Sequence, residues 1–283
     1  MKAVIFGAGG MLGRALAREL PSARAHPRED LDITDVSAVR AALVPGVTHV
    51  LNAAAYTRVD EAESDRTHVR VNQDAVGVVA ARCREIGAVF VHVSTDYVFN
   101  GRGIRPYRED DAVDPVNAYG RGKLGGERRA FEYGGPVLVV RSSWLFGGGG
   151  PNFVDTILKK AEAGEKELRV VHDQVGRPTG TQDLARAIRI LVERRAVGLV
   201  HFANAGETSW YELASEALRL AGHRDVTLLR IPSAEVPGRA RRPAYSVLDT
   251  SVYERLVADK PRPWGDALAS YVAARVAAPP VSA

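Results

Sequence analysis

The chain has 283 residues, of which 46% are hydrophobic and 25% are charged. These proportions are those of an ordinary globular protein and exclude a disordered or fibrous one. The basic residues behind the net charge of +4 are scattered among acidic ones, which argues against a nucleic-acid partner. A single cysteine excludes an intramolecular disulfide, and no run reaches the roughly 20 apolar residues needed to span a bilayer. We therefore expect a cytoplasmic protein that does not bind membranes.

In chain order, short β-branched segments alternate with helical ones over the first half of the sequence. We expect strands at 2–6, 49–54, 89–94 and 137–141, and helices at 11–20, 36–43, 66–86 and 117–133. This alternation predicts a parallel sheet, as part of a Rossmann-type doubly wound α/β domain over residues 1–150.

The regular alternation of strands and helices ends after the four glycines at 147–150. We expect helices at 152–163 and 181–193, strands at 168–171 and 199–202, a loop rich in proline and arginine at 226–245, and a frayed tail at 277–283. Residues 151–283 are predicted to form mainly a smaller C-terminal substrate-binding lobe, with residues from about 172 to 205 returning to the first domain.

Gly7, Gly10 and Gly13 follow the first predicted strand and open the first helix. The turn needs a positive φ, the backbone must approach a pyrophosphate without a Cβ in the way, and the helix N-terminus offers free N–H groups to phosphates. The motif predicts a dinucleotide-binding loop, although a plain turn fits the same glycines. Ala53, Ala54 and Ala55 end the third predicted strand, where small side chains would let the cofactor pack against the backbone.

The end of the second strand bears on the choice of cofactor. Residues 24–28 (RAHPR) include no acidic residue that would repel a 2′-phosphate. We assign Asp32 and Ile33 to the adenine edge and expect NADPH or NADH, with NADPH slightly favoured. Alternatively, Asp32 belongs with Thr34 and Asp35 to the N-terminal cap of the next helix.

Tyr119 and Lys123 lie four residues apart on a predicted helix and therefore share one face. A lysine ammonium nearby favours the phenolate of a tyrosine and brings its pKa into a useful range for acid–base catalysis. Thr95, or Ser94 before it, ends the fourth strand where ligands bind in open α/β sheets, and can hydrogen-bond a substrate carbonyl. We predict Thr95, Tyr119 and Lys123 as the catalytic set. The alternatives are a chance helical spacing and a strand-end cap.

Longer stretches surround these residues and cover nearly the whole chain: GAGGMLG at 7–13, DLDITD at 30–35, LNAAAYTRVDEAE at 51–63, VSTDYVFNG at 93–101, NAYGRGKLGGE at 117–127, RSSWLFG at 141–147, DQVGRPTG at 173–180 and ARRP at 240–243. With them the sequence resembles the extended short-chain dehydrogenase/reductase superfamily and, within it, the dTDP-4-dehydrorhamnose reductase family. The resemblance implies NAD(P)H-dependent reduction of the C4 keto group of dTDP-4-dehydro-L-rhamnose.

The resemblance also implies roles for individual residues. The cofactor would contact Gly10, Met11, Leu12, Asp32, Ile33, Ala53 and Ala54. The nucleotide-diphosphate sugar would contact Thr95, Asp96, Trp144, Asn152, Arg177, Arg241 and Arg242. Arginine forks suit a diphosphate, which agrees with the last three of these residues. A core or hinge aromatic is the alternative role for Trp144.

Two other functions stay open at this point. One is another nucleotide-sugar reductase or epimerase of the same superfamily, and the other is a non-catalytic regulatory subunit. Some members of the family are described as magnesium-linked dimers with a glutamate two residues after the third glycine of the loop, where this sequence has Ala15. We therefore expect no required metal, and either a monomer or a homodimer.

Overall fold

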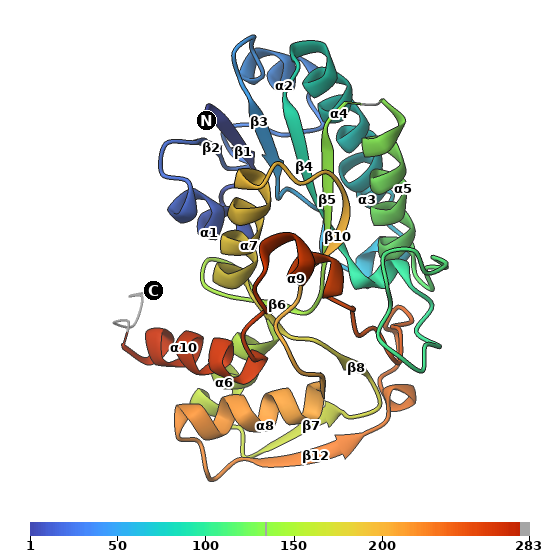
Figure 1. Ribbon diagram of the computed structural model, residues 1–283. Helices are drawn as coiled ribbons and strands as arrows, with labels where there is room; N and C mark the ends of the chain where they lie inside the picture. Colours follow the sequence, from blue (N-terminus) through green and yellow to red (C-terminus); the bar gives the residue numbers. More distant parts are fainter. Residues whose placement is uncertain (134, 278–283) are drawn as a thin grey trace.

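A six-stranded parallel sheet forms the upper part of the molecule in the computed structural model, which describes residues 1–133 and 135–277 (Figure 1). The strand order is β10-β5-β4-β3-β1-β2. The strands are β1 (Ala3–Phe6), β2 (Arg24–His26), β3 (His49–Asn52), β4 (Val89–Thr95), β5 (Val137–Ser142) and β10 (Gly198–His201). The tail predicted at 277–283 lies outside the described residues except for its first position.

Helices cover both faces of this sheet. On one face lie α1 (Met11–Glu19), α7 (Thr181–Glu193) and α9 (Ser251–Val257), with Leu16 and Ile188 in their shared core. On the other face lie α2 (Val36–Ala42), α4 (Ala75–Ile86) and α5 (Ala118–Glu132), with Val39 and Val79 in the core. Every residue of β1 and β5 is buried, as expected for strands covered on both sides. The predicted doubly wound α/β fold is confirmed.

The connections place a switch in chain direction between β1 and β3, which pair side by side. The chain runs from β1 outward to β2, crosses back to β3 and continues through β4 and β5 toward the other edge. In open α/β sheets, ligands bind at the carboxyl ends of strands beside such a point. Gly7 and Ala53 follow the two strands there, so the predicted cofactor segments meet at the expected edge.

A smaller layer lies below the sheet (Figure 1). Its strands β7 (Glu167–Val171) and β12 (Thr227–Ile231) pair in parallel, and its helices are α6 (Phe153–Glu162), α8 (Trp210–Ala221) and α10 (Trp264–Ala277). Leu158, Val170, Leu213 and Leu268 are among the residues of its core. The boundary proposed at residue 150 stays a prediction.

The prediction of a continuous loop at 226–245 is wrong, because β12 lies within it. Only Ile231 of this strand is buried, so the segment lacks the apolar alternation by which a strand is recognised. Its pairing with β7 holds it in place.

Short elements complete the fold. They are β6 (Leu145–Phe146), β8 (Val175–Gly176), β9 (Thr179–Gly180), β11 (Thr208–Ser209), α3 (Thr67–Val69), the π-helical turn η2 (Arg70–Asp74) and the 3₁₀ turns η1 (Glu61–Glu63), η3 (Asp96–Val98) and η4 (Ser233–Glu235). The helix predicted at 66–86 is therefore α3, η2 and α4 in succession. In residues 1–133 and 135–277, no helix combines the length and the apolar character needed to cross a membrane.

Candidate active site

The glycine loop is held against the end of β3 by close backbone contact. Gly7 has a φ of +74°, and a Cβ there would lie 2.5 Å from the backbone nitrogen of Ala54. A Cβ on Gly13 would lie 2.1 Å from the carbonyl oxygen of Gly7. Gly10 occupies the N-cap position of α1 and has no side chain to cover the first N–H groups of the helix. The loop therefore has the form of a phosphate cradle at a helix N-terminus.

Asp32 and Ile33 occupy different environments. The Asp32 carboxylate accepts hydrogen bonds from the backbone nitrogen and hydroxyl of Thr34, at 2.9 and 2.8 Å, and the first of these lowers its pKa. Its side chain remains 42% exposed. Ile33 is buried in the core, so only its backbone can face a ligand. The N-cap of α2 is Asp35, whose carboxylate accepts hydrogen bonds from two backbone nitrogens. The capping role that was the alternative for Asp32 therefore belongs to Asp35.

Tyr119 lies in the first turn of α5, next to the end of β4. Its ring meets the ring of Tyr97 edge to face, with centroids 5.9 Å apart. Burial raises the pKa of Tyr119 to about 12, Asp96 adds to the rise, and a hydrogen bond with the Thr95 side chain opposes it. The predicted lowering of this pKa by Lys123 is wrong for the protein alone, since the effect of burial dominates.

Lys123 is directed at the sheet. Its side chain is buried, and its Nζ donates to the carbonyl oxygen of Val93 at 2.6 Å and lies 3.4 Å from His92 Nε2. Burial lowers the pKa of Lys123 to about 8, while the Glu127 carboxylate opposes the fall. Glu127 itself receives two hydrogen bonds from the buried guanidinium of Arg141, at 2.9 and 2.7 Å. The ion pair thus fixes α5 on the sheet one turn beyond the lysine.

A cavity of about 970 Å³ lies next to this pair of tyrosines. Tyr97 lines it and so connects it with Tyr119. The other polar and aromatic side chains that line it include Arg102, Phe153, Lys160, Glu165, Glu167, Arg169, Gln174, Trp210, Glu235, Arg239, Arg241 and Arg242. Cationic groups outnumber carboxylates in this wall, which favours an anionic ligand.

Trp144 reaches the cavity wall through a stacked partner. Its ring lies on that of Trp210, with centroids 3.6 Å apart and planes 5° from parallel. Trp144 has a φ of +48°, an unusual backbone conformation for a bulky residue, and a Cβ on Gly176 would lie 2.5 Å from its ring. The Trp210 indole nitrogen donates to Gln174. The tight packing is compatible with the alternative prediction of a hinge aromatic as well as with a sugar contact.

The remaining predicted substrate residues are spread over different places. Arg241 and Arg242 line the cavity, and Arg242 also pairs with Asp60. Asn152 lies outside the cavity as the N-cap of α6, where its amide bonds backbone atoms and Tyr271. Arg177 also lies outside the cavity; it is half-buried and its guanidinium contacts Thr250. The structure therefore brings the arginine pair together with the cavity but not these other two residues.

Asp96 follows Thr95 and is fully buried. Burial raises the pKa of its carboxyl group to about 7, while bonds from Ser246, Thr95 and the backbone oppose the rise. The Thr95 hydroxyl donates to Asp96 Oδ1 at 3.1 Å and accepts from the Tyr97 nitrogen at 3.2 Å. Thr95 thus also serves as the cap that the alternative prediction gives it, so its hydroxyl has both a structural bond and a place beside Tyr119.

Several site residues escaped the sequence analysis. Tyr97 and Trp210 line the cavity although they lie far apart in the sequence. Arg14 donates to the carbonyl oxygen of Gly9 on the phosphate cradle. Of these, only Tyr97 had a signal in the sequence, because it lies inside the VSTDYVFNG stretch.

Comparison with known proteins places the chain in a family. Residues 1–276 match the model described as the RmlD substrate binding domain. The chain belongs to this family. It is 40% identical to the spore coat polysaccharide biosynthesis protein SpsK of Bacillus subtilis, with 98% of this chain and 99% of that protein covered. It is 41% identical to a dTDP-4-dehydrorhamnose reductase of Streptomyces griseus, with 94% and 91% covered.

A solved structure extends the likeness to three dimensions. The dTDP-4-dehydrorhamnose reductase of Bacillus anthracis, solved in complex with NADP, matches with a TM-score of 0.92 at 33% identity, over 97% of this chain and 100% of that one. The predicted resemblance is confirmed. Within the described parts of the chain, no group of three or more His, Cys, Asp or Glu side chains is arranged to hold a metal ion.

Proposed function

We propose that the protein is an oxidoreductase that uses NADPH or NADH to reduce the C4 keto group of dTDP-4-dehydro-L-rhamnose, yielding dTDP-L-rhamnose. The observation that carries the proposal is the position of Tyr119. Its hydroxyl lies beside Thr95 at the carboxyl end of the sheet, and its ring contacts the wall of a cationic cavity through Tyr97. Membership of the family supports the same activity.

The cofactor would lie at the switch point between β1 and β3. The glycine cradle fits a pyrophosphate, because Gly7 and Gly13 leave no space for a Cβ and Gly10 leaves the helix N–H groups uncovered. When bound, the reduced nicotinamide supplies the hydride that C4 accepts. Asp32, with its exposed carboxylate, and the three alanines after β3 are the proposed contacts of the adenosine half.

The substrate would enter the cavity with its diphosphate toward the arginines. Planar guanidinium groups donate two parallel hydrogen bonds to phosphate oxygens, and Arg241 and Arg242 supply such groups in the wall. Trp210 and Tyr97 offer aromatic faces for the base or the sugar. We place the keto group between the cavity and Tyr119.

The chemistry assigned to the protein is proton delivery. On substrate binding, Thr95 would turn its one hydroxyl hydrogen from Asp96 to the C4 carbonyl oxygen. Tyr119 would give its hydroxyl proton to that oxygen as it becomes an alkoxide. Because the pKa of Tyr119 is raised to about 12, the residue is protonated at neutral pH and ready to act as the acid. Lys123 would hold the neighbouring ribose hydroxyls and supply positive charge.

The test is an activity assay with purified protein. The substrate is generated in place from its precursor, and the absorbance of NADPH, then NADH, is followed with and without the sugar. Oxidation that needs the sugar, with dTDP-L-rhamnose as the product on chromatography, is the expected result. Turnover only with another nucleotide sugar would overturn the substrate assignment. Cofactor binding without turnover of any sugar would overturn the catalytic function and favour a regulatory role.

A further inference from the structure

A chain of buried polar groups connects the end of β3 with Lys123. Asn52 on β3 is paired in register with His92 on β4, and Asn52 Nδ2 lies 3.3 Å from His92 Nδ1. The other ring nitrogen, His92 Nε2, lies 3.4 Å from Lys123 Nζ. These three residues are 1%, 0% and 2% exposed. With so little access to water, the polar atoms must satisfy one another, so the direction of each bond matters.

The donor and acceptor roles along this series of polar groups follow from Asn52. The backbone nitrogen of Ala54 donates to Asn52 Oδ1 at 3.1 Å, so the amide NH₂ of Asn52 faces His92 Nδ1 as a donor. A neutral imidazole that accepts at Nδ1 carries its proton on Nε2. His92 is held neutral, because burial, and then the charge of Lys123, lower its pKa well below its ordinary value. His92 therefore presents an N–H group to the lysine.

An N–H group facing an ammonium is a donor against a donor, whereas a neutral amine has a lone pair that can accept. The carbonyl oxygen of Val93, 2.6 Å from Nζ, accepts one of the hydrogens that the amine keeps. We propose that His92 is a positioning residue that lowers the cost of the neutral-amine form of Lys123, so that the charged lysine can release a proton during turnover and regain it.

The role rests on the proposed reductase function. Once Tyr119 has given its proton to the substrate oxygen, it is a phenolate and must be protonated again before the next cycle. A proton released by Lys123 restores the phenol and leaves a neutral amine, which regains a proton from water when the product departs. His92 lowers the cost of the intermediate amine and does not itself gain or lose a proton.

The charged and titratable groups around Lys123 allow both its charged and its neutral form. Burial lowers the pKa of Lys123 to about 8. Glu127 opposes that fall, but its carboxylate is engaged by Arg141. The elements packed against α5 bring further titratable groups to this side of the sheet, and α5 carries its own. They include Tyr119 and Glu127 on α5, His92 on β4, Arg141 on β5, Asp96 and Tyr97 on η3, His68 on α3, Arg70 and Asp74 on η2, Glu61 and Glu63 on η1, and Arg82, Cys83, Arg84 and Glu85 on α4.

The first test reads the tautomer directly. Nitrogen-15 NMR of the full-length protein distinguishes a protonated from an unprotonated ring nitrogen, and the His92 signals are assigned by their loss in His92→Phe. We expect a neutral ring with the proton on Nε2. A proton on Nδ1, or a charged imidazolium, would overturn the proposal. Should His92→Phe fail to fold, His92→Gln provides the assignment.

The second test follows Lys123 itself, which is one of six lysines. Its side-chain carbon signal is titrated in protein labelled at lysine. In His92→Phe, a flat ring of similar size keeps the lysine buried but removes the opposing donor. In Asn52→Leu, the imidazole proton can move to Nδ1. Both variants should raise the midpoint of the Lys123 titration by about one pH unit, since a hydrogen bond and one pKa unit are of similar free energy.

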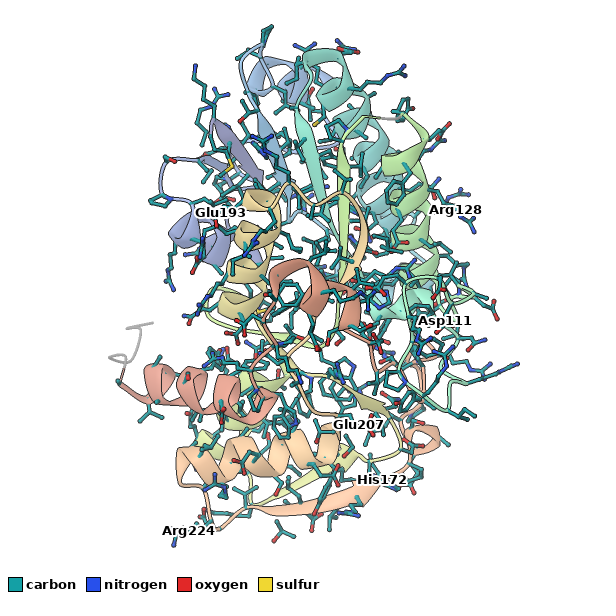
Figure 2. The ribbon with its side chains drawn as sticks, viewed as in Figure 1. Asp111, Arg128, His172, Glu193, Glu207 and Arg224 are labelled. Carbon is teal, nitrogen blue, oxygen red and sulfur yellow. The ribbon has the colours of Figure 1, made fainter. Side chains whose placement is uncertain are left out.

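A matched control is His172→Phe, a change of the same kind at an exposed residue of the lower layer (Figure 2). It should leave the Lys123 midpoint unchanged. An unchanged midpoint in both His92→Phe and Asn52→Leu would contradict the role of His92. These measurements use no substrate. A wild-type protein that shows the expected tautomer but does not reduce the keto sugar would therefore overturn the proposed function. The finding that neutral His92 carries its proton on Nε2 would still hold.

Discussion

Replacing Tyr119 by phenylalanine removes one hydroxyl group and little else. The ring keeps its edge-to-face contact with Tyr97, whose centroid is 5.9 Å away, and the backbone of α5 is unchanged. The lost hydrogen bond with Thr95 should destabilise the fold by about 1 kcal/mol. General acid catalysis contributes about 100-fold or more, so kcat should fall at least ~100-fold, which corresponds to about 2.7 kcal/mol in the barrier.

The assay compares kcat, KM and NADPH affinity of Tyr119→Phe with those of the wild type. The Kd for NADPH should stay within about threefold, because the cradle at Gly7 is distant in sequence and rests on other contacts. Tyr253→Phe is the control, since it removes a tyrosine hydroxyl from a buried residue of the core on α9 and should keep normal turnover. Near-normal kcat in Tyr119→Phe, or an equal loss in Tyr253→Phe, would refute the assignment.

Four further predictions follow from the structure. Gly13→Ala places a Cβ 2.1 Å from the carbonyl oxygen of Gly7, so NADPH binding measured by calorimetry should weaken at least ~10-fold, while Gly265→Ala, in open space, should bind normally. Glu127→Gln leaves a buried guanidinium without its charged partner and should cost about 3 kcal/mol of unfolding free energy in urea; a loss below about 1 kcal/mol would contradict this. The Asp96 carboxyl has a pKa of about 7 in the fold against 3.8 normally, so its contribution to stability is complete below about pH 4 and is lost as the pH rises through 7. Between pH 4 and 8 the free energy of unfolding of Asp96→Asn should therefore rise relative to that of the wild type by up to roughly 4 kcal/mol. Parallel curves of stability against pH for the two proteins would contradict this. Turnover should survive excess EDTA, and a loss that magnesium restores would overturn the expectation of a metal-independent reaction.

Those parts of the site that depend on local spacing could be predicted from the sequence. Gly7 and Gly13 mark a strand, turn and helix within a few residues, and Tyr119 and Lys123 share a helix face by their separation alone. For the same reason the doubly wound fold was accessible, since each buried strand is a short apolar run between helices.

Features that depend on the environment of a residue rather than on spacing could not be predicted from the sequence. The contact of Asn152 with the substrate stays a prediction; an asparagine before a helix is as readily an N-cap, and Asn152 caps α6. The exposed strand β12 has no alternating pattern to reveal it. The pKa of Tyr119 was predicted to fall because of a nearby charge, whereas the depth of burial, which the sequence does not contain, raises it.

The surroundings of Lys123 explain why a four-residue spacing describes the site only in part. Tyr119, Lys123 and Glu127 follow one another at intervals of four along α5, and the helix carries them from the partly exposed edge of the site into the buried layer beside the sheet. At the buried end, Glu127 raises the pKa of Lys123, but the effect is small because its carboxylate is paired with Arg141. At the middle position, the lysine meets His92, whose free N–H favours the amine over the ammonium. The two influences act in opposite directions on one proton. A lysine balanced in this way can serve as a proton reserve for Tyr119, which a permanently charged lysine at the same spacing could not do.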